Sequence, residues 1–198
     1  MPGQHGGQGT NGLVISNVGD IAGQYTDSSG VQHGFVRSGN TGTITEFGPP
    51  NSSFTFVKAI NKAGRIVGFS ARKTGSGSHE VGFLRMADGT FFPVSVPGSL
   101  DTEPQAINDS GHIAGWYDDS LGTHGLVWDG SGSYVTFDAP GTVTNVTGLS
   151  LFGKITGDYI SSGVHHGFLR DELGNITSFE FPVRPARFRP PSLPSEKL

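Results

Sequence analysis

Short apolar runs, separated by turn-forming residues, recur along the whole chain. In the clearest copy, the run Ala106-Ile107 is followed by Asn108-Asp109-Ser110-Gly111 and then by the apolar run 113–117. Asn and Asp bond their own backbone in tight turns and Gly accepts a positive φ, so the second run returns antiparallel to the first. Two further runs, 125–128 and 134–137, follow after polar turns. The pattern predicts four short antiparallel strands, ended by a proline that cannot donate to a sheet.

This unit occurs four times. A glycine recurs in the second predicted strand at positions 23, 68, 115 and 157, which gives spacings of 45, 47 and 42 residues. A threonine recurs in the first predicted strand, four residues before a small or branched residue. These threonines are Thr10, Thr55, Thr102 and Thr144. Periods of this length are typical of repeat architectures.

Four-stranded units that cannot bury both faces alone stack around an axis as propeller blades. We therefore predict an all-β fold, a propeller of four four-stranded blades over residues 1–183, with blades at about 2–49, 50–97, 98–140 and 141–182. The first strand of each blade is expected nearest the axis. An alternative is half of an eight-bladed ring that two chains form together. Residues 184–198 contain four prolines and three arginines and are expected to form an extended tail.

Composition narrows the choice of partners. The net charge of −4 argues against nucleic-acid and anionic-membrane surfaces, because both require clustered Lys and Arg. The chain contains no cysteine, which excludes disulfides, thiol catalysis and cysteine-ligated zinc. No apolar run reaches the length of a signal peptide or a membrane span. We therefore expect a small molecule or a protein as the partner, and a monomer or a homodimer.

The repeat resembles a known family. The motif Ile-Asn-Asp-Ser-Gly-x-Ile-x-Gly-x-Tyr at 107–117, His-Gly-Phe-Leu at 166–169 and Thr-Phe-Asp-x-Pro-Gly at 136–141 are similar to the HAF repeats of bacterial, largely extracellular proteins. The resemblance covers residues 2–182 and implies an extracellular location and a propeller-like fold with Kelch-like blades. It implies no catalytic residues. The second copy departs from the pattern, with Ser70 in place of Tyr and Val81 in place of His.

Only side chains on the innermost strands can converge near an axis. Two sets of equivalent positions qualify, one at each end of these strands. The first set is Asn11, Phe56, Glu103 and Asn145, and the second is Ser16, Asn61, Asn108 and Ser150. Oxygen ligands of this kind suit a hard cation such as Ca²⁺. The sequence thus predicts an axial Ca²⁺ site with Glu103, Asn11 and Asn145, or with Asn61 and Asn108, although Asn before Asp-Ser-Gly also has a simple role in the turn.

Several other residues are candidates for binding. His33, His124 and His166 recur at one position, but equivalent atoms far from an axis cannot share one metal, so we interpret them as structural. The recurrent tyrosines are expected to pack between blades. Trp128 replaces a polar or charged residue and is predicted to be an exposed aromatic. We assign ligand binding to Trp116, Tyr117 and Arg72, the last because it lies in the expanded loop of the second copy.

These observations leave two functions open. No nucleophile motif, phosphate loop or zincin helix occurs in the sequence. The first hypothesis is a propeller module that binds a small ligand or a partner at one mouth of its channel. The second is a Ca²⁺-dependent hydrolase of lactones or esters, similar in architecture to propeller lactonases. In that case Glu103 holds the metal, and Asp101, Asp119 or His112 acts as the base.

Overall fold

A computed structural model describes residues 9–74, 77–130 and 132–180, excluding the side chains of 72–78. Every regular element among these residues is a β-strand, which confirms the predicted all-β class. None of the described segments is a helix that could cross a membrane. The predicted Pro/Arg-rich tail lies outside the described residues.

The 16 strands form four consecutive antiparallel meanders, which we call units 1 to 4. Unit 1 contains β1 (Gly9–Ile15), β2 (Ile21–Thr26), β3 (Gln32–Arg37) and β4 (Ile44–Phe47). Unit 2 contains β5 (Phe54–Ile60), β6 (Ile66–Thr74), β7 (Gly77–Arg85) and β8 (Phe91–Val94). Unit 3 contains β9 (Asp101–Ile107), β10 (Ile113–Asp118), β11 (Thr123–Trp128) and β12 (Tyr134–Phe137). Unit 4 contains β13 (Val143–Leu149), β14 (Ile155–Ser161), β15 (Val164–Arg170) and β16 (Ile176–Phe179).

Each unit joins the next mainly through side chains. Only single parallel bridges connect sheets across a boundary, Gln32 with Phe54 and Thr123 with Val143. Three buried apolar clusters fill the seams between units. One packs Phe47 against Phe83, a second packs Val94 with Trp128, and a third packs Ala114 with Phe168. The hydrophobic core therefore lies between the units, as expected for stacked blades.

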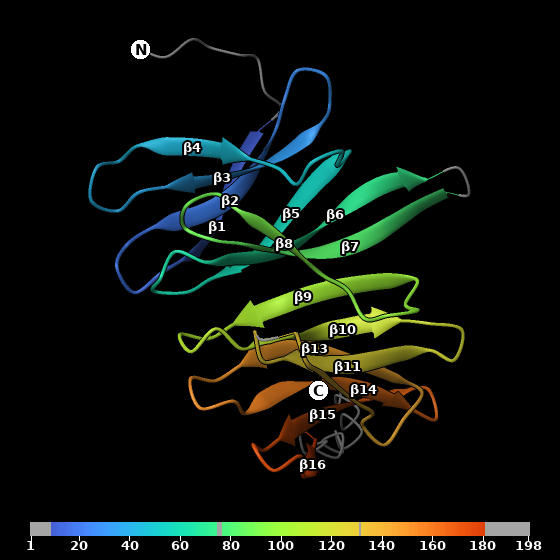
Figure 1. The fold of residues 1–198 in the computed structure, drawn as a ribbon. Coiled ribbons are helices and arrows are strands. Elements are labelled where there is room, and N and C mark those ends of the chain that lie inside the picture. The colour runs from blue at the N-terminus through green and yellow to red at the C-terminus, as the bar shows by residue number, and fades with distance from the viewer. Residues whose placement is uncertain (1–8, 75–76, 131, 181–198) are drawn as a thin grey trace, which may run out of the picture.

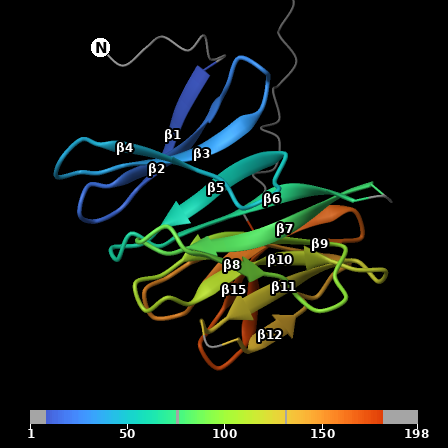
Figure 2. The same ribbon diagram turned by 45° about the horizontal axis from the view of Figure 1, so that its top comes forward.

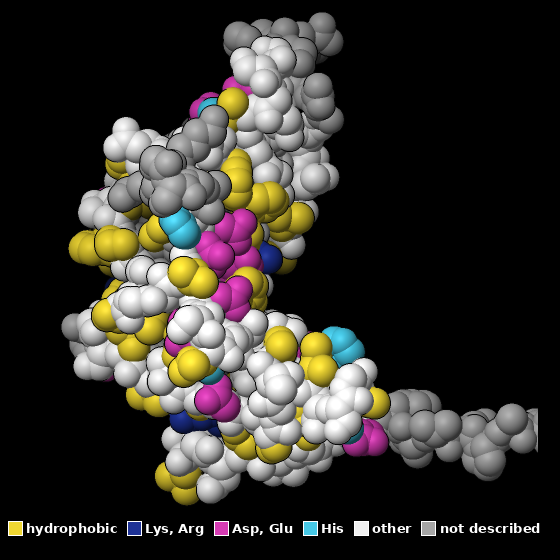
Figure 3. Space-filling view, turned by 90° about the vertical axis from the view of Figure 1, so that its right-hand side faces the viewer, with side chains coloured by type: hydrophobic (Ala, Val, Ile, Leu, Met, Phe, Trp, Pro, Cys, Tyr) yellow, Lys and Arg dark blue, Asp and Glu magenta, His cyan; other side chains and the backbone are white. Residues whose placement is uncertain are grey.

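The four units are arranged as an arc. In Figures 1 and 2 they follow one another in chain order, and Figure 3 shows the curved outline of the molecule from its side. All substantial contacts between strands of different units join consecutive units, and within the described residues β1–β4 have no comparable contact with β13–β16. A closed four-bladed ring would bring the first and last units together. In this arc, units 1 and 4 each have one face against which no other described unit packs.

A bulge shapes the first hairpin of every unit. The pairing between the first two strands shifts register next to the recurrent glycine, as between Val57 and Ala59 or between Ala114 and Gly115. The bulge pushes the first-strand carbonyl against this glycine. A Cβ at Gly68 would lie 1.9 Å from the Phe56 oxygen, and one at Gly157 would lie 1.8 Å from the Asn145 oxygen. The sequence repeat is thus explained by close backbone approach.

Candidate functional site

The first strands of all four units end around one shared cavity. This cavity has a volume of about 200 Å³, and equivalent hairpin turns of all four units line it, with Ile15, Ile60, Ile107 and Leu149 among the lining residues. The first strands are therefore the innermost ones, as the sequence predicts. We call this end of the axis the turn mouth.

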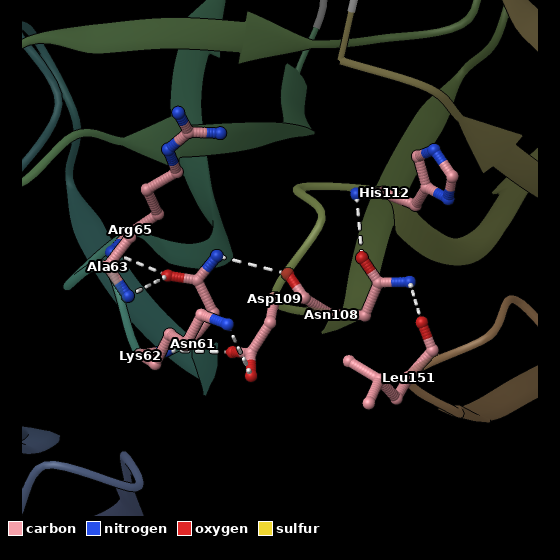
Figure 4. A network of polar contacts seen from close by, with 8 residues as sticks. All are labelled: Asn61, Lys62, Ala63, Arg65, Asn108, Asp109, His112 and Leu151. Atoms are coloured by element: carbon pink, nitrogen blue, oxygen red, sulfur yellow. Dashed lines mark hydrogen bonds and ion pairs between the residues drawn. The ribbon is translucent and has the colours of Figure 1, made fainter.

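Asn61 and Asn108 join neighbouring units at the turn mouth (Figure 4). Asn61 Nδ2 donates to the Asn108 oxygen at 3.0 Å, and Asn108 Nδ2 donates to the Leu151 oxygen at 3.2 Å. Each Oδ1 also accepts from its own turn, at 3.0 Å from Arg65 N and 3.0 Å from His112 N. Both amide heads are thus engaged in turn formation and in holding units together. A Ca²⁺ ion at Asn61 and Asn108 would have to compete with these bonds.

Glu103 lies at the opposite end of the innermost strands, which we call the Glu mouth. Its side chain is buried, with the residue only 8% exposed. One carboxylate oxygen, Oε2, lies 2.9 Å from Gln105 Nε2 and 3.8 Å from Lys58 Nζ. Lys58 also sits over the ring of Phe69, 5.2 Å from its centroid. Figure 3 shows Asp and Glu side chains gathered near the middle of the face that carries the β6–β7 hairpin, with a basic side chain beside them.

Burial and the carboxyl of Glu80, from the neighbouring unit, raise the pKa of Glu103. Burial raises the pKa of Glu103, and the hydrogen bond and charge of Glu80 raise it further, to about 8. Lys58 and Gln105 oppose this shift, since both favour the ionised carboxylate. Glu80 is itself held by its backbone, which donates to Asp101 Oδ1 at 2.7 Å. With a pKa of about 8, Glu103 keeps its proton at neutral pH, a state that is uncommon for exposed carboxyl groups.

The raised pKa predicts that stability falls as the pH rises. The folded chain keeps the Glu103 proton up to about pH 8, whereas the unfolded chain loses it near the ordinary value of 4.5. The free energy of unfolding should thus decrease between these pH values, by about 1 to 3 kcal/mol. Glu103→Gln, which cannot ionise, should remove this decrease. Urea unfolding at pH 5 and pH 8 measures the difference.

The exposed Glu172→Gln is the control for that measurement, since its carboxyl lies on the surface of unit 4. It should keep the full pH dependence of the unsubstituted chain. An equal pH dependence in Glu103→Gln and in the unsubstituted chain would contradict the raised pKa of Glu103.

The other predicted cation ligands at this end have surroundings of their own. Asn145 donates to Asp158 Oδ2 of its own unit at 3.3 Å, and Asn11 is exposed on unit 1. Phe56 occupies the equivalent position in unit 2, where it stacks on Phe69 at 4.9 Å. Within the described part of the chain, no three His, Asp or Glu side chains lie close enough together to hold a metal ion.

The recurrent histidines form structural contacts within their own units. His33, His124 and His166 each stack on the recurrent tyrosine of the neighbouring strand, at 5.0 to 5.1 Å between ring centroids. Each also bonds a carboxylate. For His124, burial lowers the pKa but the carboxylates of Asp138 and Asp119 outweigh it, so the net shift is upward. These contacts account for the histidines without a shared metal.

The three proposed bases occupy different surroundings. Asp101 lies beside Glu80 at the Glu mouth. Asp119 binds the Leu121 backbone at 2.6 Å and His124 at 3.2 Å. His112 lines a cavity between units 3 and 4, and its ring points away from the asparagine network in Figure 4. Of the three, only Asp101 has a contact that links it to the Glu80–Glu103 pair.

The predicted aromatic sites differ in exposure. Trp128 is only 7% exposed and packs in the seam between units 2 and 3, so the prediction of an exposed aromatic is wrong. Tyr117 is buried beneath His124, which leaves little of its ring for a ligand. Trp116 is half-buried and pairs with Glu103 across the sheet. The side chain of Arg72 lies outside the described residues.

Sequence reasoning missed Glu80, Lys58 and Gln105 as partners of Glu103. Gln105 could have been found, because residues two apart on a strand share a face. Glu80 could not have been found, because the expanded hairpin of unit 2 makes its strand register unpredictable from the repeat. Lys58 could not have been found either, because it lies on a different unit.

Comparisons with known proteins support the fold. No family model matches the chain, and no curated protein matches it in sequence. Among solved structures, a streptogramin B lyase matches with a TM-score of 0.52 and 14% identity, covering 89% of this chain and 70% of the lyase. Virginiamycin B lyase from Staphylococcus aureus matches with a TM-score of 0.43 and 14% identity, covering 92% and 72%. A Bombyx mori beta-fructofuranosidase in complex with sucrose matches with a TM-score of 0.42 and 12% identity, covering 83% and 45%. The first of these likenesses identifies the fold as β-propeller-like, and at 14% identity it extends to the fold alone.

Proposed function

We propose that this chain is a propeller-like binding module whose ligand docks at the Glu mouth. The observation that carries the proposal is the Glu80–Glu103 pair, a buried carboxyl that keeps its proton to a pKa of about 8 beside a second carboxyl. Such an arrangement lowers stability at neutral pH, and perturbed groups of this kind concentrate at functional sites. At the turn mouth, in contrast, the asparagine side chains are already bonded to backbone carbonyls of the next unit.

The chemistry of the pair favours a small ligand with a cationic group. A single positive charge placed between Glu80 and Glu103 would replace the proton of Glu103 and leave the net charge of the pair and Lys58 unchanged. Phe56 stacks on the buried ring of Phe69 next to Lys58, and its partly exposed ring offers an apolar surface for the rest of the ligand. An alkylammonium compound therefore fits the donors and the surface.

Calorimetric titration tests this proposal with cadaverine as the probe. Binding at pH 7 should release a proton from Glu103, so the measured heat should differ between buffers of different ionisation enthalpy. Glu103→Gln should abolish both the binding and the proton release, whereas Glu172→Gln should retain them. Cadaverine binding that is unchanged by Glu103→Gln, or no binding to the unsubstituted chain, would contradict a cation site at this mouth.

A Ca²⁺-dependent hydrolase of lactones or esters is the second candidate, because the same pair can bind a hard cation. Glu103 and Glu80 would hold the ion, which would polarise a carbonyl and activate water, and Asp101 is the base nearest to them. The donor set fits in part, since Asn11 and Asn145 have other surroundings. Ca²⁺ should then raise the melting temperature and support lactone turnover, and a chelator or Glu103→Gln should remove both effects. A melting temperature that does not change when Ca²⁺ is added would exclude this candidate.

We also propose that the arc is half of an eight-unit ring, closed by a second copy of the chain. Support comes from the free faces of units 1 and 4. These two faces correspond to the two faces that pack together wherever consecutive units of the arc meet. A light-scattering mass of twice 20.8 kDa is the expected result. The resemblance to HAF repeats, the extracellular location that it implies, and the expected absence of nucleic-acid and membrane partners remain predictions.

A further inference from the structure

The three seams between units contain equivalent cavities at the same place. Each cavity lies between the third and fourth strands of one unit and the third strand and first turn of the next. The residue at the end of the third strand contributes to each, and the strand pairing aligns Arg85, Trp128 and Arg170 opposite Ile66, Ile113 and Ile155. The molecule thus provides its own comparison, three copies of one site with different side chains.

The cavity in the middle seam has about twice the volume of each of the other two cavities. It measures about 450 Å³, compared with about 190 Å³ in the first seam and 240 Å³ in the third. In the outer seams an arginine covers a phenylalanine of the preceding unit, Arg85 over Phe47 and Arg170 over Phe137. In the middle seam Trp128 instead stacks on Tyr134, and Gly130 replaces the larger Ala87 and Glu172 of the other seams. A volume of this size is within the range of small-molecule sites.

The middle cavity also differs in charge. The lining of the first seam includes Asp20 with Arg85, and that of the third includes Glu172 with Arg170. Among the described residues, the lining of the middle cavity includes Arg65 and no acidic side chain. In Figure 4 the guanidinium of Arg65 extends away from the asparagine network, and it lies against the backbone of Gly111. The remaining walls are apolar or aromatic, with Phe92, Trp128 and Tyr134 among them.

We propose that this middle-seam pocket binds a small planar apolar anion, such as an aromatic carboxylate or sulfonate. The aromatic walls pack against the ring system of the ligand, and Arg65 pairs with its acidic group. The pocket is separate in sequence and in lining residues from the Glu mouth, so it goes beyond the proposed function. The outer seams lack it because their arginines already fill the equivalent space.

Two fluorescent probes with closely related ring systems test the proposal. 8-Anilinonaphthalene-1-sulfonate carries a negative charge, and N-phenyl-1-naphthylamine carries none. In a Trp116→Phe background Trp128 is the only tryptophan, so energy transfer from it reports binding in this pocket. We expect saturable binding of both probes at one site per chain. Arg65→Gln should weaken the sulfonate about tenfold and leave the neutral probe unchanged.

Variants of equivalent positions supply the controls. Phe92→Thr introduces the residue that unit 1 has at the equivalent position, Thr45, and should weaken both probes. Val135→Thr makes a similar change in the third seam and should affect neither probe. Near-ultraviolet circular dichroism checks that each variant keeps its packing. Equal affinities of Arg65→Gln and the parent for the sulfonate, or insensitivity of both probes to Phe92→Thr, would overturn the proposal.

Discussion

Gly68→Ala should lower the free energy of unfolding by at least about 3 kcal/mol, which corresponds to a fall in melting temperature of about 6 to 12 °C. The added Cβ would lie 1.9 Å from the Phe56 oxygen and 3.0 Å from the ring of Phe83. The clash with the Phe56 oxygen involves backbone, so it cannot be relieved by rotating a side chain. The strands β5 and β6 must therefore separate at the bulge. Unit 2 has neighbours on both sides, which means that the shift also strains two seams. Thermal unfolding measured by circular dichroism gives the comparison.

The pair Gly12 and Gly23 provides a matched control within one hairpin, since the two residues face each other across β1 and β2. A Cβ at Gly23 would lie 2.0 Å from the Asn11 oxygen, whereas one at Gly12 would meet only a methyl group of Ile21 at 3.3 Å. Gly23→Ala should thus be clearly destabilising and Gly12→Ala nearly neutral. Similar losses in both variants would show that helix or strand propensity, and not the bulge, explains the recurrent glycine.

The strands and their order could be predicted from the sequence because their signals are local. Turn residues such as Asn108 and Gly111 specify the hairpins, and the recurrent glycines mark the period. The role of Asn61 and Asn108 in the turns also follows from this chemistry. Their second bond, to the carbonyl of the next unit, depends on how adjacent turns meet at the axis, and no local pattern contains that information.

The candidate sites show the same limit. Glu103 is predictable because its position on an innermost strand allows convergence near an axis, but its partner Glu80 lies across a seam that forms only when the units pack. Trp128 was expected at the surface because arginines occupy its position in other units. Burial against Val94 and Tyr134 became available only because unit 2 has Val94 where other units have phenylalanine. Paired changes on two units are not visible when each repeat is interpreted alone.

The sequence of one repeat does not determine how many units close the ring. The two ends of the arc, however, expose apolar side chains whose counterparts in other units are buried. On unit 4, Phe179 is 56% exposed, whereas its counterpart Phe47 is 7% exposed beneath the arginine of the next unit. On unit 1, Ile15 is 68% exposed, whereas its counterpart Ile60 is 9% exposed. Arg37 is equivalent to Arg85 and Arg170, but unit 1 is the first of the described units, and no ring of the described residues lies beneath it as Phe47 lies beneath Arg85.

The first-strand threonines give the same result. Thr102 and Thr144 are buried, and their Oγ1 atoms accept from Val96 N and Ala139 N at the end of the preceding unit. Thr10 occupies the equivalent position in unit 1 and is exposed. In the two-chain ring proposed above, each end of the arc would supply one half of a seam. A second copy placed end to end would restore the seam twice, once at each junction.

Exchange variants test this assembly. Phe179→Arg should convert the dimer to a monomer, because Arg37 would then face a second cation at both junctions, and Arg37→Phe should weaken the dimer by removing its cation–π contact. The double variant should restore the dimer, since the arginine and the ring have only changed sides. Leu121→Glu, at a residue that is 85% exposed on the loop after β10, should leave the mass unchanged. Light scattering across a concentration series gives the masses. A monomeric unsubstituted chain, or a double variant that remains monomeric while its circular dichroism is unchanged, would show that these end faces do not meet, because restoration by exchange requires direct contact between the two positions.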